Sequence, residues 1–349
     1  MSTIKKMKKA VSFDDVLLVP RYSSIESRSQ IDTSIEPNNI SKLELPIFSA
    51  PMDTVTETEM AISLANHGGL GIIHRYNTPQ EQQLIVSEVC DYFADTGVQG
   101  YKNVGVAVGV SGDYMIRAKL AFASGARVVC VDVAHGDHIL AINAVTELRR
   151  AFGKKIHIMA GNVATLEGFN ALADAGADSV RVGIGGGSIC STRIQTGHGV
   201  PTLQSVLDCS VTDRDCLIIA DGGIKTSGDI VKAYAAGADA VMLGSLLAGT
   251  TEAPGATVFK DGRQLKTYRG MASVEAQIDW RGHAASEEGV STVIPAKGPV
   301  GNVLKSLGKG IRSGLSYSGA RSMREFQSVA QFVEITSSGM SESRTHILD

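Results

Sequence analysis

The chain has 349 residues, of which 43% are hydrophobic and 20% charged, so it holds enough apolar material for a large core. The formal net charge is −3 and the lysines and arginines are scattered, which excludes a basic face for nucleic acid and a polybasic segment for a lipid surface. No apolar run approaches the roughly 18 residues of a membrane span, and the start of the chain lacks the apolar core of a signal peptide. We therefore expect a cytoplasmic protein with a small-molecule partner.

Eight short runs rich in Val, Ile and Leu recur along the chain, most of them separated by a stretch of helical periodicity. The predicted strands are Pro46–Ala50, Gly69–His74, Asn103–Val108, Val128–Asp132, Ile156–Ala160, Ser179–Val182, Cys216–Ala220 and Ala240–Leu243. The helices predicted between them include Glu57–Asn66, Pro79–Tyr92, Tyr114–Ala123, Leu140–Phe152, Leu166–Ala175 and Gly228–Ala236. Eightfold alternation closes a barrel more naturally than it builds an open sheet. The predicted fold class is thus α/β, a (β/α)₈ TIM barrel that forms one domain over residues 1–349.

Two segments lie outside this repeat. Residues 1–45 form an N-terminal extension, and residues 250–298 separate the eighth strand from a last helix near Val300–Ser313. The second segment follows the C-terminal end of a strand, where barrels place their chemistry, and we predict that it contains a mobile flap. The polar stretch Ser337–Asp349 is predicted to be an extended, loose terminus.

Glycines follow the seventh and eighth predicted strands, as Asp221-Gly222-Gly223 and Gly244-Ser245. Barrels commonly bind phosphate on main-chain N–H groups of these two loops, where glycine lets the backbone approach the anion. One such loop is explained equally well by a tight turn. The two together favour a phosphate site.

The loop after the sixth predicted strand, Gly183 to Arg193, is dense in glycine and carries one thiol. A thiol near main-chain dipoles and Arg193 gains thiolate character, so Cys190 is the candidate nucleophile. The alternative is that Cys190 is a small core residue, which is our interpretation of Cys130 and Cys216 because they lie in or beside strands. The five cysteines are odd in number and form no Cys-x-x-Cys pair, which argues against a disulfide framework and a structural zinc site.

Polar residues also end the fourth and fifth predicted strands. Asp132 and His135 follow the fourth, and Asn162 follows the fifth, at the same end of the barrel as Cys190. Such groups usually contact ligand, although His135 could instead cap a turn. Hydrolase functions lack a motif, because no G-x-S-x-G or H-E-x-x-H occurs.

Together these motifs resemble the IMP dehydrogenase / GMP reductase family over nearly the whole chain. The segments that carry the resemblance are Phe13–Leu18, Pro51–Val55, Gly71–His74, Ala160–Val163, the Cys190 loop, Ala220–Ile224 and Tyr268–Met271. The resemblance implies that Cys190 attacks C2 of the purine in IMP, XMP or GMP and forms an adduct that exchanges hydride with NADP or NAD. Thr192 and Glu288 match the pair that handles protons.

The resemblance also assigns binding residues. Asp132 and His135 would lie on the cofactor side, with Asp132 on the cofactor ribose. The residues that would contact the nucleotide are Met52, Asn162, Ser188, Asp221, Gly222, Gly223, Gly244, Ser245, Tyr268, Gly270 and Met271. Main-chain carbonyls of Gly185, Gly187 and Cys190 would hold a monovalent cation such as K⁺, completed by Glu342 and Ser343 of a neighbouring subunit in a homotetramer. The short link from Tyr92 to Asn103 replaces a regulatory module that many family dehydrogenases carry.

The flap favours a GMP reductase that uses NADPH. Family dehydrogenases hydrolyse the adduct with an Arg-Tyr pair on a long flap, whereas this flap is short and offers only Trp280-Arg281. IMP dehydrogenase remains the alternative, because Asp132–Gly136, Tyr268–Met271 and Glu342–His346 look like dehydrogenase versions. Arg75 also stands where reductases place a lysine that assists ammonia release. An alternative of another class is a purine nucleotide binder without catalysis, which would need none of Cys190, Thr192 and Glu288.

Overall fold

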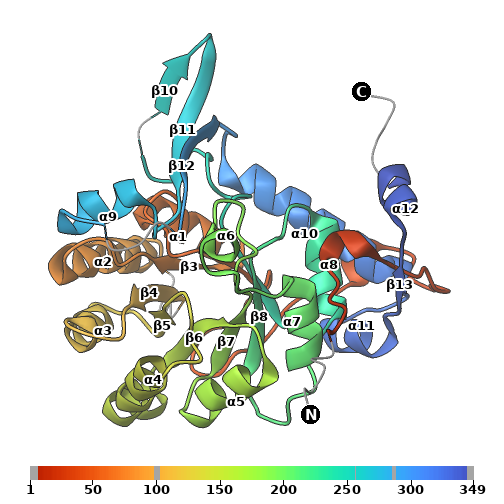
Figure 1. Ribbon diagram of the computed structural model, residues 1–349, viewed down its shortest axis with the longest axis horizontal. Coiled ribbons are helices and arrows are strands. Elements are labelled where there is room, and N and C mark those ends of the chain that lie inside the picture. Colours follow the sequence, from red (N-terminus) through yellow and green to blue (C-terminus); the bar gives the residue numbers. More distant parts are fainter. Residues whose placement is uncertain (1–6, 98–102, 256, 285–287, 344–349) are drawn as a thin grey trace, which may run out of the picture.

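The barrel predicted from the sequence is present in the computed structural model, which describes residues 7–97, 103–255, 257–284 and 288–343 (Figure 1). Eight parallel strands pair in sequence order, and β2 closes the ring by pairing with β9. The barrel strands are β2 (Ile47–Ser49), β3 (Leu70–Ile73), β4 (Val104–Val108), β5 (Val128–Asp132), β6 (His157–Val163), β7 (Ser179–Val182), β8 (Leu217–Asp221) and β9 (Ala240–Leu243). Each predicted strand corresponds to one of them, so the fold class is confirmed.

Helices cover the outside of the barrel (Figure 1). They are α1 (Thr58–Asn66), α2 (Pro79–Asp95), α3 (Tyr114–Ala123), α4 (Ile139–Phe152), α5 (Leu166–Asp174), α7 (Thr202–Cys209), α8 (Ser227–Ala235) and α10 (Val300–Tyr317). Their starts follow ordinary capping chemistry: Thr78 and Glu81 form a capping box at α2, with Pro79 as the first helical residue. The short elements are η1 (Phe13–Asp15), η2 (Arg28–Gln30), η3 (Gly153–Lys155) and α6 (Thr192–Thr196).

The apolar residues form two separate cores. One lies between strands and helices, and the other fills the inside of the barrel with side chains such as Phe48, Ile72, Met159, Ile219 and Met242. A barrel of eight strands is just wide enough to be filled in this way. A ligand can therefore enter only at the ends of the barrel, not through it. In the described part of the chain, no helix is both long and apolar enough to cross a membrane.

The two ends of the chain pair with each other. Strand β1 (Val16–Leu18) lies antiparallel to β13 (Phe332–Glu334), and α11 (Met323–Val329) precedes β13. The C-terminal stretch corrects one prediction: Ser337–Glu342 is not extended but forms helix α12, because Thr336 caps its start by accepting from the N–H of Gly339. Glu342 ends this helix and Ser343 caps it, whereas residues 344–346 of the dehydrogenase-like segment Glu342–His346 lie outside the described residues.

The segment predicted to contain a flap folds into an antiparallel sheet and a helix. The sheet has the order β10 (Thr257–Lys260), β11 (Arg263–Arg269), β12 (Ser291–Pro295), and α9 (Val274–Arg281) lies between β11 and β12 in the chain. The β10–β11 hairpin projects away from the barrel, while the other ends of β11 and β12 lead toward its mouth (Figure 1). We call the described residues 268–284 and 288–290 at this mouth the flap.

Candidate active site

A cavity of about 420 Å³ lies at the C-terminal ends of the barrel strands. It brings together residues predicted from segments far apart in the sequence. Those that line it are Met52, Asp132, Asn162, Gly185, Gly187, Ser188, Cys190, Thr192, Asp221, Gly222, Gly223, Gly244, Ser245, Tyr268, Gly270, Met271 and Glu288. His135 is exposed and is not part of this lining, and Glu342 and Ser343 lie on α12, away from it.

The thiol of Cys190 lies beside the hydroxyl of Thr192. Cys190 Sγ donates to Thr192 Oγ1 at 3.1 Å, and the N–H of Cys190 donates to the carbonyl of Gly187 at 3.1 Å. Thr192 is the first residue of α6, which fixes its position relative to the loop. A thiol and a hydroxyl, two groups that can serve as nucleophile and proton relay, are thus neighbours.

The flap pairs with the Cys190 loop as a short piece of antiparallel sheet. Ser191 N–H donates to the carbonyl of Glu288 at 3.3 Å, Val290 N–H donates to the carbonyl of Ile189 at 3.1 Å, and Cys190 and Gly289 form the bridge between them. This pairing brings Glu288 to the cavity although it lies 98 positions after Cys190 in the sequence. Glu288 and Cys190 therefore line the same cavity.

Arg193 differs from the sequence-based expectation. Its guanidinium donates to the carbonyls of Ile184 and Val200, at 3.3 and 2.7 Å, and its side chain packs against the positions where Gly185 and Gly199 lack a Cβ. Arg193 thus links the start of the Cys190 loop, at Ile184, to Val200 in the segment that follows α6. Its guanidinium binds these carbonyls instead of acting mainly on the thiol.

Two glycine loops approach each other closely at one side of the cavity, where the sequence predicts a phosphate site. Gly183 has φ +144°, and a Cβ there would lie 2.0 Å from the carbonyl oxygen of Asp221. Gly222 has φ +91°, and its Cβ would lie 3.1 Å from the main-chain nitrogen of Gly187. Only glycine suits both positions, so the loops form a cradle of backbone.

Side chains complete this cradle. Ser188 Oγ and Tyr268 OH share a hydrogen bond at 3.3 Å, and burial raises the pKa of Tyr268, which therefore stays protonated. Lys297, which the sequence did not single out, donates to the carbonyls of Ser245 and Leu246. Main-chain N–H groups, two hydroxyls and a nearby cation suit a phosphate group.

A buried cation joins two of the predicted binding carboxylates. Arg181 Nη1 lies 2.7 Å from Asp132 Oδ1, and its Nε lies 3.1 Å from Asp221 Oδ2, with its side chain 8% exposed. Burial opposes the charge on Arg181, but Cys130, Asp132 and Asp221 raise its pKa above the ordinary value, so it stays charged. Both carboxylates are thereby held at fixed positions.

Two polar atoms at the cavity have no hydrogen-bond partner in the described part of the chain. Asn162 Nδ2 donates to Asp221 Oδ2 and to the carbonyl of Gly183, both at 2.8 Å, but Asn162 Oδ1 is buried without a partner. Arg75 Nε is also buried without a hydrogen bond, 3.7 Å from Asp132 Oδ2. A buried unpaired donor or acceptor is costly, and here each belongs to a residue that lines the cavity, so a polar ligand fits.

Aromatic and basic side chains gather on the flap side of the cavity. Tyr76 stacks on Trp280 with ring centroids 4.3 Å apart, and the guanidinium carbons of Arg75 and Arg281 lie 5.7 and 4.9 Å from the centroid of Trp280. Tyr76 OH donates to the carbonyl of Met271 and accepts from Arg281. Burial raises the pKa of Tyr76 against the opposing charge of Arg75, so it is a donor at neutral pH.

Sequence reasoning missed several of these residues. Arg181 carried a signal, because it is a charged residue inside an otherwise apolar predicted strand. Tyr76, Gln277 and Lys297 also lie at or beside the cavity but belong to no motif that the sequence analysis used. Within the described ranges, no group of three or more His, Cys, Asp and Glu side chains is placed to hold a metal ion. The predicted cation site uses main-chain carbonyls, and it stays a prediction.

Comparison with known proteins agrees with this geometry. The profile of a family described as "IMP dehydrogenase / GMP reductase domain" matches residues 10–346. Inosine-5′-monophosphate dehydrogenase of Nitrosopumilus maritimus is 34% identical, with 98% of this chain and 99% of that protein covered. GMP reductase of Leishmania major is 31% identical, with 99% and 98% covered.

A solved structure extends the comparison to three dimensions. A GMP reductase variant from Trypanosoma brucei, in complex with guanosine 5′-monophosphate, superimposes with a TM-score of 0.89 at 32% identity, covering 97% of this chain and 98% of that chain. Profile, relatives and structure span almost the whole molecule, including the Cys190 loop and the flap. The chain therefore belongs to the IMP dehydrogenase / GMP reductase family of oxidoreductases.

Proposed function

We propose that this protein is a GMP reductase that converts GMP and NADPH to IMP, ammonia and NADP⁺ through a covalent adduct on Cys190. The family binds purine nucleotides and uses nicotinamide cofactors, which supply or accept a hydride. The phosphate of the nucleotide would lie on Ser188, Gly223, Gly244, Ser245 and Tyr268, next to Gly222, and its ribose on Asp221. The purine would then lie between Cys190 and the main chain of Gly270 and Met271.

The chain's own groups carry out the covalent steps. Cys190 Sγ, as a thiolate, bonds to C2 of the purine, and the C2–N bond breaks as the departing amino group takes up protons and leaves as ammonia. Thr192 and Glu288 would deliver these protons, a role that their presence in the same cavity lining as Cys190 supports. A hydride then adds to C2, the C–S bond breaks, and the sulfur leaves as thiolate. Asp132, held by Arg181, would orient the cofactor ribose.

The contacts of Arg281 are the observation that favours GMP reductase over IMP dehydrogenase. In the described part of the flap, Arg281 is the one cation that lines the cavity, and its hydrogen bonds go to Tyr76 and Gln277 while it stacks on Trp280. A guanidinium held in this way has little freedom to activate water at an adduct on Cys190. Without activated water, release and addition of ammonia is the better-suited chemistry.

The same contact also favours a second candidate, IMP dehydrogenase. Tyr76 and Arg281 come from different loops but place a phenol and a guanidinium together at the cavity. These are the two groups that the resemblance assigns to hydrolysis of the adduct. If they act on water, the product from IMP is XMP and the cofactor is NAD⁺.

Measuring the absorbance of the reduced nicotinamide distinguishes GMP reductase from IMP dehydrogenase. We expect a decrease with GMP plus NADPH and no increase with IMP plus NAD⁺, with IMP identified by chromatography. Turnover in the second mixture alone would overturn the reductase, and Arg281→Gln would then be expected to abolish XMP formation. If neither mixture turns over, intact-mass measurement decides: an unmodified Cys190 in the presence of nucleotide and cofactor would make the protein a binder.

Several details stay predictions on this proposal. They are the preference for NADP(H) over NAD(H), K⁺ at the carbonyls of Gly185, Gly187 and Cys190, the contribution of Glu342 and Ser343 from a neighbouring subunit, the homotetramer, and His135 on the cofactor side. The first is checked by comparing kcat/KM for NADPH and NADH, and the second by activity in potassium and in lithium buffers.

A further inference from the structure

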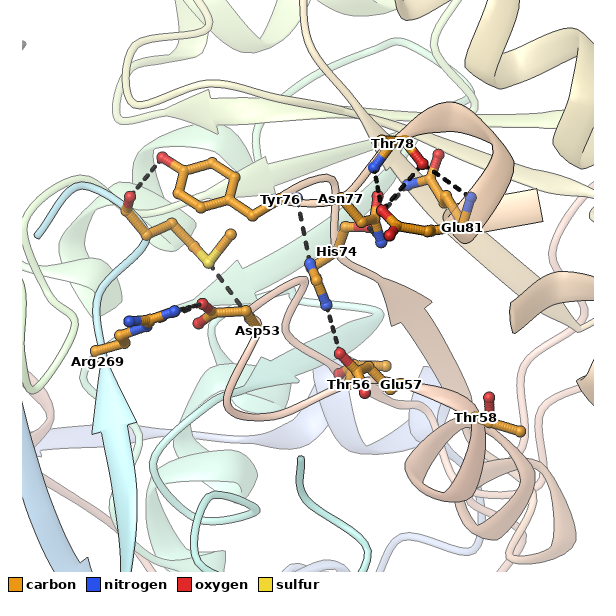
Figure 2. Close-up of polar contacts among 12 residues, drawn as sticks. Asp53, Thr56, Glu57, Thr58, His74, Tyr76, Asn77, Thr78, Glu81 and Arg269 are labelled. Carbon is orange, nitrogen blue, oxygen red and sulfur yellow. Dashed lines mark hydrogen bonds and ion pairs between the residues drawn. The ribbon is translucent and has the colours of Figure 1, made fainter. Parts of the chain in front are cut away.

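Arg269 faces two carboxylates that belong to different parts of the molecule. It ends β11, directly before Gly270 and Met271 of the cavity lining. Its Nε and Nη2 donate to Asp53 Oδ2 at 2.9 and 2.5 Å, as Figure 2 shows. Its Nη1 donates to Asp279 Oδ2. The Asp53 side chain is 10% exposed and that of Asp279 is 62% exposed. The guanidinium of Arg269 therefore makes two ion pairs. We call the pair with the buried Asp53 the buried arm, and the pair with the exposed Asp279 of α9 the exposed arm or α9 arm.

The buried arm is part of a wider attachment. Thr54 Oγ1 accepts from the N–H of Arg269 at 3.3 Å, and the N–H of Asp53 donates to Met271 Sδ at 3.3 Å. Asp53 Oδ1 is buried without a hydrogen-bond partner in the described chain, so the paired oxygen of this carboxylate depends on Arg269 alone. The loop after β2 thus holds residues 269–271 by side chain and main chain together.

A second loop holds the same segment from the other side. Tyr76 donates to the carbonyl of Met271, and the N–H of Tyr76 donates to His74 Nδ1 at 3.2 Å. His74 Nε2 in turn lies 2.9 Å from Glu57 Oε1, as Figure 2 shows. The loops after β2 and β3 thereby fix the main chain that faces the purine.

From these contacts we infer that Arg269 is a positioning residue with two separable tasks. Through Asp53 it holds Gly270 and Met271 against the purine, and through Asp279 it fixes helix α9, which carries Gln277 and Arg281 at the cavity. The inference rests on the proposed function, because it takes the purine to bind beside Met271. It goes beyond that function in assigning the nucleotide side and the flap side of the site to different arms of one residue.

Steady-state kinetics of Asp53→Asn and Asp279→Asn test this division. Asp53→Asn removes the buried charge, and we expect the KM for nucleotide to rise about tenfold with kcat within about twofold of wild type, as for the loss of a contact that binds substrate and transition state equally. Asp279→Asn loosens an exposed pair, and we expect it to leave the nucleotide KM unchanged and to lower kcat/KM for the dinucleotide about threefold.

Matched controls come from the far end of the same hairpin. Asp261→Asn and Arg263→Gln change one exposed carboxylate and the first residue of β11, and both are expected to behave as wild type. Arg269→Lys keeps one cation and is expected to retain the nucleotide KM through Asp53 while losing the α9 arm. Arg269→Gln is expected to lose both.

The inference is overturned if Asp53→Asn and Asp279→Asn change the same parameter in the same proportion, or if they change only the thermal unfolding temperature. Should Asp53→Asn fail to fold, Arg269→Gln is compared with Arg269→Lys instead: both lose the α9 arm and only Arg269→Gln loses the Asp53 arm, so a nucleotide KM that is the same in both would overturn the inference. If wild type turns over no purine nucleotide, the proposed function fails separately, and calorimetric Kd values for GMP and NADPH then replace KM: retention of both affinities in Asp53→Asn would overturn the positioning role as well.

Discussion

Buried polar groups occupy both ends of the barrel, but they are used differently. At the start of the strands, His157 has partners for both ring nitrogens, in the carbonyl of Asn38 and the hydroxyl of Ser179, and Asp178 pairs with Arg149 and the N–H of Ile158. At the mouth, Asn162 Oδ1 and Arg75 Nε have no hydrogen-bond partner in the described chain. The closed end satisfies its own polar groups, and the open end leaves some for a ligand.

The two ends of the barrel therefore contribute differently to stability and to turnover. Burial lowers the pKa of His157, which therefore stays neutral and serves as a fixed link between loop and strand. At the mouth, Arg181 keeps its charge between two carboxylates that face the cavity. Changes at the mouth should therefore alter turnover more than stability, and changes at the closed end should do the reverse.

The largest expected effect at the mouth comes from Cys190→Ser. We expect turnover to fall by at least roughly 10³-fold, because a hydroxyl is a far weaker nucleophile than a thiolate at neutral pH. The thermal unfolding temperature should stay near that of wild type. Cys209→Ala is the matched change in the core between strands and helices, where burial raises the pKa of the thiol to about 12 and we expect a loss of stability instead. Intact turnover by Cys190→Ser would refute the covalent step.

Gly222→Ala tests the backbone cradle. Forcing a non-glycine residue to φ +91° next to the main chain of Gly187 costs about 1–3 kcal/mol, and we expect the nucleotide KM to rise about tenfold to a hundredfold. Gly153→Ala is the control at the closed end: it has φ +57° but no atom within 4 Å of the added Cβ. It should lower stability and leave the KM as it is. Equal KM effects at the two glycines would remove the distinction between the ends.

A smaller effect is expected from Tyr76→Phe. The ring can still stack on Trp280, but the hydrogen bonds to Met271 and Arg281 are lost, at about 1 kcal/mol, which corresponds to roughly a fivefold loss in kcat/KM. Steady-state kinetics beside those of Tyr317→Phe, an exposed tyrosine on α10, give the measurement. An unchanged kcat/KM in both would show that the phenol contacts are not used.

The closed end is expected to show its effect in stability against pH. Burial raises the pKa of Asp239 from 3.8 to about 6, although the N–H of Ile218 donates to it and opposes the shift. Between these two values the folded state binds more protons than the unfolded state, so this group makes stability fall as pH rises from about 4 to 6, by up to about 3 kcal/mol.

Asp239→Asn should remove that fall. Chemical unfolding of Asp239→Asn and of the exposed control Asp95→Asn at pH 4, 5, 6 and 7 measures it, with turnover as a second readout. We expect a flatter profile only in the first variant, at unchanged kcat. An identical slope in wild type and Asp239→Asn would contradict the role given to burial.

The sequence predicted the barrel well because its signals are local. Each strand is a run of apolar residues that ends in a small or polar residue. The Cys190 loop and the pair Gly222 and Gly223 come directly after such strands, so their positions could be predicted too. The flap gave no such signal. The contacts of Asp53 with Arg269 and of Tyr76 with Trp280 join residues about 200 positions apart, and each residue alone is an ordinary polar or aromatic side chain.

The same limit explains the smaller misses. Helix α12 depends on one cap at Thr336 within a polar stretch, and Met340 alone gives no helical pattern of apolar residues. Arg193 was paired with the thiol because they are neighbours in sequence, whereas its reach allows it to bind carbonyls at both ends of the loop. Proximity in sequence located the site but did not assign its internal partners.

The antiparallel pairing of Ile189–Ser191 with Glu288–Val290 joins the Cys190 loop to the flap. If the flap lifts to admit substrate, the hydrogen bonds that pair it with the Cys190 loop must break, so substrate entry and an intact pairing beside the sulfur would exclude each other. The rate at which a small alkylating reagent labels Cys190 would therefore report how often the flap lifts.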